Sequence, residues 1–266
     1  MAIAILGAGK IGEALLSGLL RSGVPADELS FSEQYAARAE SLSQSYGVRA
    51  VTNAHAAAFA DVVVLAVKPA DIETLAAEIA PALGDKTLVV SVAAGITISF
   101  LESKLPVGTR VVRVMPNTPM LVGEGMSAIS GGTHAGDADL ESAEALLGAV
   151  GRVVRLPESQ LDAVTALSGS GPAYVFLLVE ALIDAGVLLG LPRAVASELA
   201  IQTALGSALM LRDSGDSAAQ LREAVTSPGG TTAAALRTFE AHGLRAAVND
   251  ALVAARDRSI ELAAGK

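Results

Sequence analysis

Three glycines near the amino terminus have the spacing of a turn that binds phosphate groups. Gly7, Gly9 and Gly12 follow the apolar run 2–6 and precede the amphipathic stretch 13–21, as in a strand that turns sharply into a helix. In such a turn the first glycine permits the bend, the second lets the backbone approach a pyrophosphate, and the third lets the helix pack on the strand. The helix N-terminus then offers free N–H groups to an anion. The spacing predicts an anion-binding turn made by Leu6, Gly7, Ala8, Gly9, Lys10, Ile11 and Gly12.

An acidic residue ends the next strand-like segment. Glu33 comes directly after Ser32, the last residue of the run 29–32. In dinucleotide-binding βαβ units, an acid about 20 residues beyond the glycine turn hydrogen-bonds the adenosine ribose. The glycine pattern by itself is weak, because it arises by chance in a chain with 26 glycines. The strand, the helix and the acid together favour a dinucleotide site over an ordinary strand-to-helix turn.

Composition restricts the class of protein. The 266 residues are 52% hydrophobic and the mean hydropathy is +0.50, so the chain must bury a large core in one large or two modest domains. The absence of cysteine excludes disulfides and cysteine-based metal sites or nucleophiles, and we expect no metal. A net charge of -9, with three tyrosines and five phenylalanines as the aromatic residues, disfavours a nucleic-acid partner.

The chain shows no secretory signal and no clean membrane span. A core strand begins at once, without a basic region and a cleavable apolar stretch. The most apolar later stretch, 173–191, contains Glu180 and Asp184, which are costly within a bilayer. We therefore expect a cytoplasmic protein with no membrane partner.

The elements that must position these residues alternate between strand and helix over the first half of the chain. This alternation predicts an α/β fold, a Rossmann-type doubly wound parallel sheet with its ligand at the carboxyl ends of the strands. Pro157 is the expected boundary of this dinucleotide-binding domain, 1–157. Strands are predicted at 2–6, 29–32, 48–51, 61–67, 87–92, 110–115, 126–130 and 152–156, and helices at 13–21, 35–45, 54–60, 71–80, 97–104 and 137–147.

The residues that follow these strands are the candidate cofactor contacts, because carboxyl ends of parallel strands share one edge. Lys68 is either a phosphate or ribose contact or a solvated loop residue. Pro116 and Pro119 favour a stiff loop that presents Asn117 and Thr118, although prolines and glycines also mark ordinary turns. Besides the glycine turn, the candidates are Ser32, Glu33, Ala66, Val67, Lys68, Pro69, Ala93, Ala94, Gly95, Met115, Pro116 and Asn117.

Beyond Pro157 the periodicity is helical throughout, which predicts an all-helical domain over 158–266. The segment 172–189 is apolar nearly all round, and a domain of this size cannot enclose such a helix. We expect a partner subunit to bury it, and hence a homodimer. Helices are predicted at 159–167, 172–189, 192–211, 217–226, 231–241 and 244–263.

Two loops in this half place hydroxyls and amides at helix starts. They are Ser168-Gly169-Ser170-Gly171-Pro172 and Thr226-Ser227-Pro228-Gly229-Gly230-Thr231-Thr232. Successive N–H groups at a helix start hold a carboxylate well. Simple N-capping by serine and threonine is the alternative for either loop.

The second of these loops resembles the diagnostic segment of the pyrroline-5-carboxylate reductases. The blocks Leu65–Pro69, Ser91–Gly95, Arg113–Pro119 and Ser168–Tyr174 also resemble blocks of that family, in its order. The resemblance spans nearly the whole chain. It implies reduction of 1-pyrroline-5-carboxylate to L-proline by NAD(P)H, the last step of proline biosynthesis. It also implies dimers with interlocked helical domains, and rings of dimers are common in the family.

The resemblance also implies particular contacts. Thr232 is expected to contact the ring nitrogen, Gly229, Gly230, Thr231 and Thr232 to bind the substrate, and Asn53 to join the cofactor contacts. The residues permit this chemistry. A hydroxy-acid dehydrogenase needs a proton acceptor in its second domain, yet no lysine lies between Lys104 and Lys266 and the sole histidine beyond Pro157 is His242. A cyclic imine has a basic nitrogen that is largely protonated near neutral pH, so an orienting hydroxyl suffices.

Three alternatives remain open from the sequence. Two are enzymes of the same two-domain group, a hydroxy-acid dehydrogenase and a deazaflavin-dependent NADP reductase. The third is a regulatory or scaffold protein that binds a dinucleotide without turnover. The missing second-domain lysine disfavours the first, the full set of family blocks disfavours the second, and an activity assay separates the third.

One residue departs from the family pattern. Many members have Ser or Asn where this chain has Glu33, and a carboxylate there repels the 2′-phosphate of NADPH. Arg38, in the following helix, is able to compensate for that charge. NADP(H) is the family's usual cofactor, and Glu33 makes NAD(H) a serious alternative.

Overall fold

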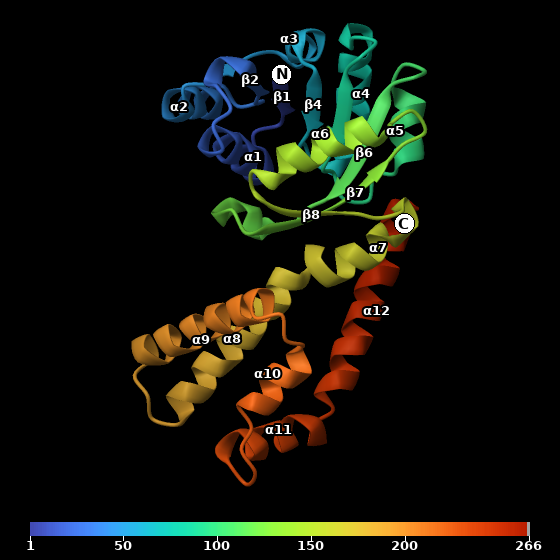
Figure 1. Cartoon of the computed structure of the whole chain (residues 1–266). Coiled ribbons are helices and arrows are strands. Elements are labelled where there is room, and N and C mark those ends of the chain that lie inside the picture. Colours follow the sequence, from blue (N-terminus) through green and yellow to red (C-terminus); the bar gives the residue numbers. More distant parts are fainter. Residues whose placement is uncertain (265–266) are drawn as a thin grey trace. The chain divides into compact units, whose positions relative to one another are not determined.

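The computed structural model describes residues 1–264 as two compact units. One unit contains Met1–Ser170 together with the chain from Ala255 onward, and the other is Gly171–Ala254. The chain therefore leaves the first unit beyond Pro157 and returns to it at its carboxyl end. Figure 1 shows a strand-rich amino-terminal part and a carboxyl-terminal part made of helices.

The described residues form one eight-stranded sheet in the order β3-β2-β1-β4-β5-β6-β7-β8. Strands β1 to β6 are parallel, as predicted, whereas β7 is antiparallel to β6 and β8 is parallel to β7. The short link 116–124 explains this reversal, because a parallel neighbour needs a longer crossover. The strands are β1 Ile3–Leu6, β2 Leu29–Ser32, β3 Arg49–Ala50, β4 Val62–Leu65, β5 Leu88–Ser91, β6 Arg110–Met115, β7 Gly125–Gly131 and β8 Gly151–Arg155.

Both faces of the sheet carry a buried apolar layer, which confirms the doubly wound fold. Alternate residues of each central strand enter opposite layers. Ile3 and Ile5 of β1 pack on one face, and Ala4 and Leu6 pack on the other. The first layer includes residues of α1 Lys10–Arg21, α2 Ala36–Tyr46 and α6 Asp137–Gly148, and the second includes residues of α3 Asn53–Phe59, α4 Ile72–Ile79 and α5 Ile98–Lys104.

The rest of the chain is helical, as predicted. Gly186 of α8 lies against Ala196 of α9, and the tight turn between these two helices contains Gly190 with φ +96°. The helices thus form an αα-hairpin that is held by a close backbone approach. The helices are α7 Leu161–Val164, α8 Gly171–Leu188, α9 Arg193–Asp213, α10 Ala218–Ala224, α11 Thr231–Ala241 and α12 Leu244–Ala263.

Helices α8 and α9 expose most of their apolar side chains. In the described structure no residue of α8 is buried, and Phe176 is 67% exposed. By length and composition the helices Glu158–Leu188 and Arg193–Asp213 would suffice to cross a membrane, although the single stretch 173–191 was not expected to. One or two such helices are weak support for a membrane protein. The exposed apolar side chains are Val175, Phe176, Leu177, Leu178, Leu182, Val187, Leu188, Val195, Leu199, Ile201, Leu205, Leu209, Met210 and Leu211.

Candidate functional site

The predicted cofactor residues gather at one edge of the sheet. The strand order reverses at β1, which has β2 on one side and β4 on the other. Hydrogen bonds continue past the strand ends, from Gly7 N to Ser32 O (3.1 Å) and from Ala66 N to Leu6 O (2.8 Å). The segments after β1, β2 and β4 therefore begin level with one another. This reversal is the position at which open α/β sheets bind their ligands.

The glycine turn has no space for a side chain at Gly7 or Gly12 but has space at Gly9. Gly7 has φ +94°, and a Cβ there would lie 2.9 Å from Ala66 O. A Cβ on Gly12 would collide with Gly7 O. At Gly9, by contrast, the structure shows no described atom within 4 Å of an added Cβ, and Gly9 precedes the first residue of α1, Lys10. The turn thus fits a pyrophosphate, because it leaves the N-terminus of α1 open to an anion.

Glu33 is held at the end of β2, beside this turn. Its side chain is 9% exposed, and Tyr35 N donates to its Oε1 (3.1 Å). Arg38 Nε lies 3.7 Å from Glu33 Oε2. Arg38 also donates to Ala8 O, from Nε (3.0 Å) and from Nη2 (2.8 Å), so it links the end of β2 to the turn.

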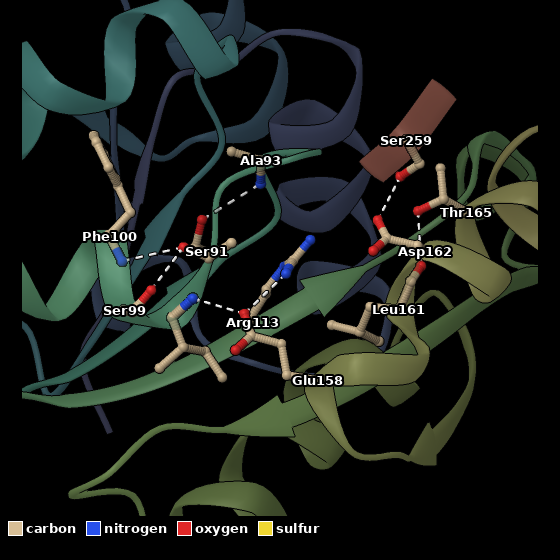
Figure 2. A network of polar contacts seen from close by, with 12 residues as sticks. Ser91, Ala93, Ser99, Phe100, Arg113, Glu158, Leu161, Asp162, Thr165 and Ser259 are labelled. Atoms are coloured by element: carbon tan, nitrogen blue, oxygen red, sulfur yellow. Dashed lines mark hydrogen bonds and ion pairs between the residues drawn. The ribbon is translucent and has the colours of Figure 1, made fainter. Parts of the chain in front are cut away.

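The segments after β4 and β5 expose different atoms. Ala66 and Val67 are half-buried, whereas Lys68 and Pro69 are exposed. Lys68 is therefore on the surface, and its contact with the cofactor stays a prediction. After β5, Ala93 is buried, with its N–H donating to Ser91 Oγ at 3.4 Å (Figure 2). Ala94 is exposed, and Gly95 has φ +75°, so the chain turns here as predicted.

Two predicted cofactor residues have side-chain amides that bind within the protein. Asn117 Oδ1 accepts from Met126 N (2.8 Å), and its Nδ2 donates to Ser168 O (3.1 Å). Asn53 Nδ2 donates to Glu78 Oε2 (2.8 Å). Asn117 therefore braces the loop that begins with buried Pro116, directly after half-buried Met115 at the end of β6, and links it to β7 and to the residues before α8. Cofactor contacts by Asn53 and Asn117 stay predictions.

The loop Ser168–Pro172 does not have the free amides that the sequence indicated. The segment Thr165–Gly169 is a π-helical turn that leads into α8. At its end Ser170 N donates to Thr165 O (2.8 Å), and Ser168 Oγ donates back to Val164 O (3.2 Å). The expectation fails because the chain is already helical when it reaches this loop. These two donors serve the helix and not an anion.

The loop before α11 does keep a hydroxyl available. Gly230 occupies the N-cap position, where it has no side chain to bind the helix, and Gly229 has φ +69°. The N-capping alternative is therefore wrong for Thr231 and Thr232, which are the first two residues of α11. Thr231 is exposed and Thr232 is half-buried, and among the described residues the Thr232 hydroxyl has no hydrogen-bond partner. The first N–H groups of a helix lack intrahelical acceptors.

Sequence reasoning missed two polar clusters. Glu13 accepts from Arg38 Nη2 (2.8 Å) and from the Tyr46 hydroxyl (3.1 Å). Arg113, 7% exposed in β6, pairs with Glu158 at 2.8 Å (Figure 2). Ile98 N donates to the same oxygen at 2.7 Å. An arginine inside the apolar run 111–114 is a signal that a carboxylate must be near. The sequence does not say which carboxylate this is.

Comparisons with known proteins agree with this geometry. Residues 158–262 match the model "Pyrroline-5-carboxylate reductase dimerisation", and residues 2–95 match "NADP oxidoreductase coenzyme F420-dependent". The second match covers part of the sheet unit alone, so it reports a dinucleotide-binding fold. It does not favour a deazaflavin-dependent enzyme over the family that the rest of the chain matches.

Whole-chain similarity is high. A pyrroline-5-carboxylate reductase from Mycobacterium tuberculosis is 52% identical over 98% of this chain and 96% of its own length. The solved structure of a pyrroline-5-carboxylate reductase from Coxiella burnetii has a TM-score of 0.93 and 37% identity, covering 98% of this chain and 97% of that one. That of Plasmodium falciparum pyrroline carboxylate reductase, with NADP bound, has a TM-score of 0.86 and 31% identity, covering 97% of each chain. The similarity thus extends over nearly the full length of this chain and of its relatives, and this chain belongs to the pyrroline-5-carboxylate reductase family.

Proposed function

We propose that the chain reduces 1-pyrroline-5-carboxylate to L-proline with a nicotinamide dinucleotide, the last step of proline biosynthesis. The observation that carries this proposal is the 52% identity to a named reductase over 98% of the chain. Conservation of fold alone would not specify a substrate. Similarity that extends through both the glycine turn and the loop before α11 supports the same reaction.

The cofactor site is proposed to lie along the carboxyl ends of the parallel strands. The turn 6–12 binds the pyrophosphate through the N–H groups at the start of α1, and Ser32 and Glu33 lie at the adenosine end. The bound nicotinamide supplies the hydride. The other proposed contacts are Asn53, Ala66, Val67, Lys68, Pro69, Ala93, Ala94, Gly95, Met115, Pro116 and Asn117.

The substrate site is proposed to use the start of α11. The N–H groups of Gly229, Thr231 and Thr232 hold the carboxylate. Gly230 belongs to the same proposed substrate site, but its own N–H donates to Ser227 O (3.0 Å) and shapes the turn. The Thr232 hydroxyl orients the ring nitrogen. Its lack of a hydrogen-bond partner among the described residues supports this role, since no structural bond within residues 1–264 occupies the hydroxyl. A protonated imine needs no strong acid, so an orienting hydrogen bond is sufficient.

Initial rates test the reaction directly. We expect oxidation of NADH or NADPH that depends on pyrroline-5-carboxylate, with L-proline as the product. A protein that binds a dinucleotide but produces no proline would contradict the proposal and favour a regulatory or scaffold role. Turnover of a hydroxy acid in place of the imine would favour the other dehydrogenases of the group.

The variant Thr232→Val tests the catalytic role. It keeps the β-branched shape and removes the hydroxyl, so we expect the melting temperature to change little and kcat to fall. One orienting hydrogen bond is worth about 1–3 kcal/mol in the transition state, or roughly ten- to a hundredfold in kcat. Thr238→Val, on the same helix, is the matched control, because its hydroxyl donates to Ala234 O. Wild-type kcat in Thr232→Val would refute the role.

The helical half, 158–266, is proposed to be the dimerisation and substrate domain. The match to the dimerisation model supports self-association. We propose that a second copy, and not lipid, covers the apolar side chains of α8 and α9, and that dimers associate further into rings. The protein is proposed to act in the cytoplasm without a nucleic-acid or membrane partner. Purification without detergent, followed by light scattering, tests the assembly.

A further inference from the structure

Arg38 occupies a central position at the adenosine end of the candidate site. It is the third residue of α2, which follows β2. Its guanidinium donates two hydrogen bonds to Ala8 O, inside the glycine turn, and one to Glu13 Oε2 on α1. Glu33 Oε2 lies 3.7 Å from its Nε. One side chain thus joins the turn, the first helix and the acid that ends β2.

The acids around Arg38 are themselves held in place. Glu13 uses one oxygen for Arg38 and the other for the Tyr46 hydroxyl at 3.1 Å. Burial and this hydrogen bond raise the pKa of Tyr46, so its phenol stays a donor at neutral pH. Glu33 accepts from Tyr35 N. The Glu33 carboxylate therefore has a fixed direction, and its remaining lone pairs are available to accept hydrogen bonds.

The charges of this cluster do not favour an added phosphate. Arg38 supplies one positive charge against the two carboxylates of Glu13 and Glu33, which leaves a net negative charge. To bind a 2′-phosphate, Arg38 would have to leave Ala8 O and Glu13 Oε2, and the phosphate would approach Glu33. A ribose diol meets neither obstacle, because it donates to a carboxylate without adding charge.

We propose that Arg38 is a positioning residue which holds Glu33 and the glycine turn in the arrangement that accepts the ribose of NADH, so that the chain selects NADH over NADPH. The inference rests on the proposed function, in that the ligand is a nicotinamide dinucleotide. It differs from the possibility that Arg38 offsets the charge of Glu33 and binds the 2′-phosphate. These two roles predict opposite changes in cofactor preference when the guanidinium is removed.

Direct binding separates the two roles without relying on catalysis. NADH and NADPH are each titrated calorimetrically into the full-length protein in the absence of substrate, and cofactor KM and kcat are then measured in the assay. We expect the wild type to bind NADH at least tenfold tighter than NADPH. Arg38→Met should weaken NADH binding about five- to tenfold and weaken NADPH by less. KM for NADH should rise in step while kcat stays near wild type.

Two further variants guard against a folding artefact. Arg38→Lys keeps the charge but loses the planar fork that reaches Ala8 O and Glu13 together. Arg38→Lys should also weaken NADH binding, but by less than Arg38→Met does. Arg21→Met is the matched control, because Arg21 is exposed and donates to Ser17 Oγ on its own helix at 3.2 Å. It should leave both affinities unchanged.

The double variant gives the sharpest test. Glu33→Ser should improve NADPH binding about tenfold, because the repelling carboxylate is gone and Arg38 can then exchange its bonds to Ala8 O and Glu13 Oε2 for the phosphate. Adding Arg38→Met should remove that gain. If Arg38→Met in the wild-type background weakens NADPH selectively, or leaves both affinities unchanged, the inference is wrong. A wild type that binds both cofactors equally overturns the inference alone, and one that binds neither overturns the proposed function with it.

Discussion

The sheet unit and the helical unit use apolar residues in opposite ways. In the sheet unit Phe31, Leu15 and Ile72 are fully buried between strands and helices. In Gly171–Ala254, Ala196 is the one residue that the described structure buries. Both parts are rich in apolar residues, so composition does not explain the difference. The arrangement of the elements in layers explains the difference, because a sheet with helices on both faces encloses its own core and a helical hairpin does not.

This contrast indicates that the sheet unit folds on contacts within one chain, whereas the helical unit depends on assembly with a second chain. The sheet unit has two complete apolar layers within one chain, so its stability is a property of that chain. The helical unit leaves large side chains such as Leu188, 88% exposed, without cover in a single chain. Patches of this kind mark protein interfaces. A second copy should therefore matter far more to the helical unit than to the sheet unit.

Placing charges on the apolar surface of α8 should have the largest effect of all the variants, namely on the dimer dissociation constant. The double variant Phe176→Glu/Leu177→Glu places carboxylates where we expect a partner. Covering each of these side chains is worth about 1.5–3 kcal/mol. Four of them in a dimer make a loss of about 6 kcal/mol or more, roughly four orders of magnitude in the dimer dissociation constant. Light scattering at micromolar concentration should then show monomers.

The control for this variant lies in the sheet unit. Val107→Glu changes an apolar residue that is fully exposed in a loop, and it should leave the dimer intact. A wild-type protein that is monomeric and well folded at the same concentration would contradict the contrast between the units. So would a double variant that remains as dimeric as the wild type.

Substitutions in the glycine turn give a second test. They should change the stability or cofactor affinity of the sheet unit by an amount between those of the other variants, without changing the dimer. Gly12→Ala forces a methyl group against Gly7 O, and such overpacking costs about 1–3 kcal/mol of stability. Gly9→Ala meets no described atom within 4 Å, so its melting temperature should be unchanged while cofactor affinity falls. Both variants should stay dimeric. Equal melting temperatures for the two would show that the turn is not packed as described.

The smallest change in the free energy of unfolding is expected for a substitution near the end of α12. Ser259 is 7% exposed, and its hydroxyl donates to Asp162 Oδ1 at 2.7 Å (Figure 2). Ser259→Ala should lower the free energy of unfolding by about 1 kcal/mol. Ser142→Ala is the control, because that hydroxyl is exposed and bonds its own helix at Ala138 O. Thermal or urea unfolding of both variants measures the difference.

Much of the fold was predictable because its signals are local. The apolar run 61–67 and the glycines at 7, 9 and 12 identified a buried strand, observed as β4 Val62–Leu65, and a tight turn. The comparisons confirm the fold and the family. The direction of β7 and β8 was not predicted, because strand pairing depends on contacts that periodicity does not report. The same limit applies to the hydrogen bonds from Arg38 to Ala8 and Glu13, whose partners lie far from it in sequence.

The C-terminal end of α12 belongs to the sheet unit, and this has a consequence for limited proteolysis. The chain enters the helical unit after Ser170 and leaves it before Ala255, so that unit is an insertion joined to the sheet unit at both ends. A single cut between Gly171 and Ala254 leaves each fragment attached to part of the sheet unit. Release of the helical unit needs two cuts. Likewise, no truncation from the carboxyl terminus removes the helical unit without first deleting Ser259 and its bond to Asp162.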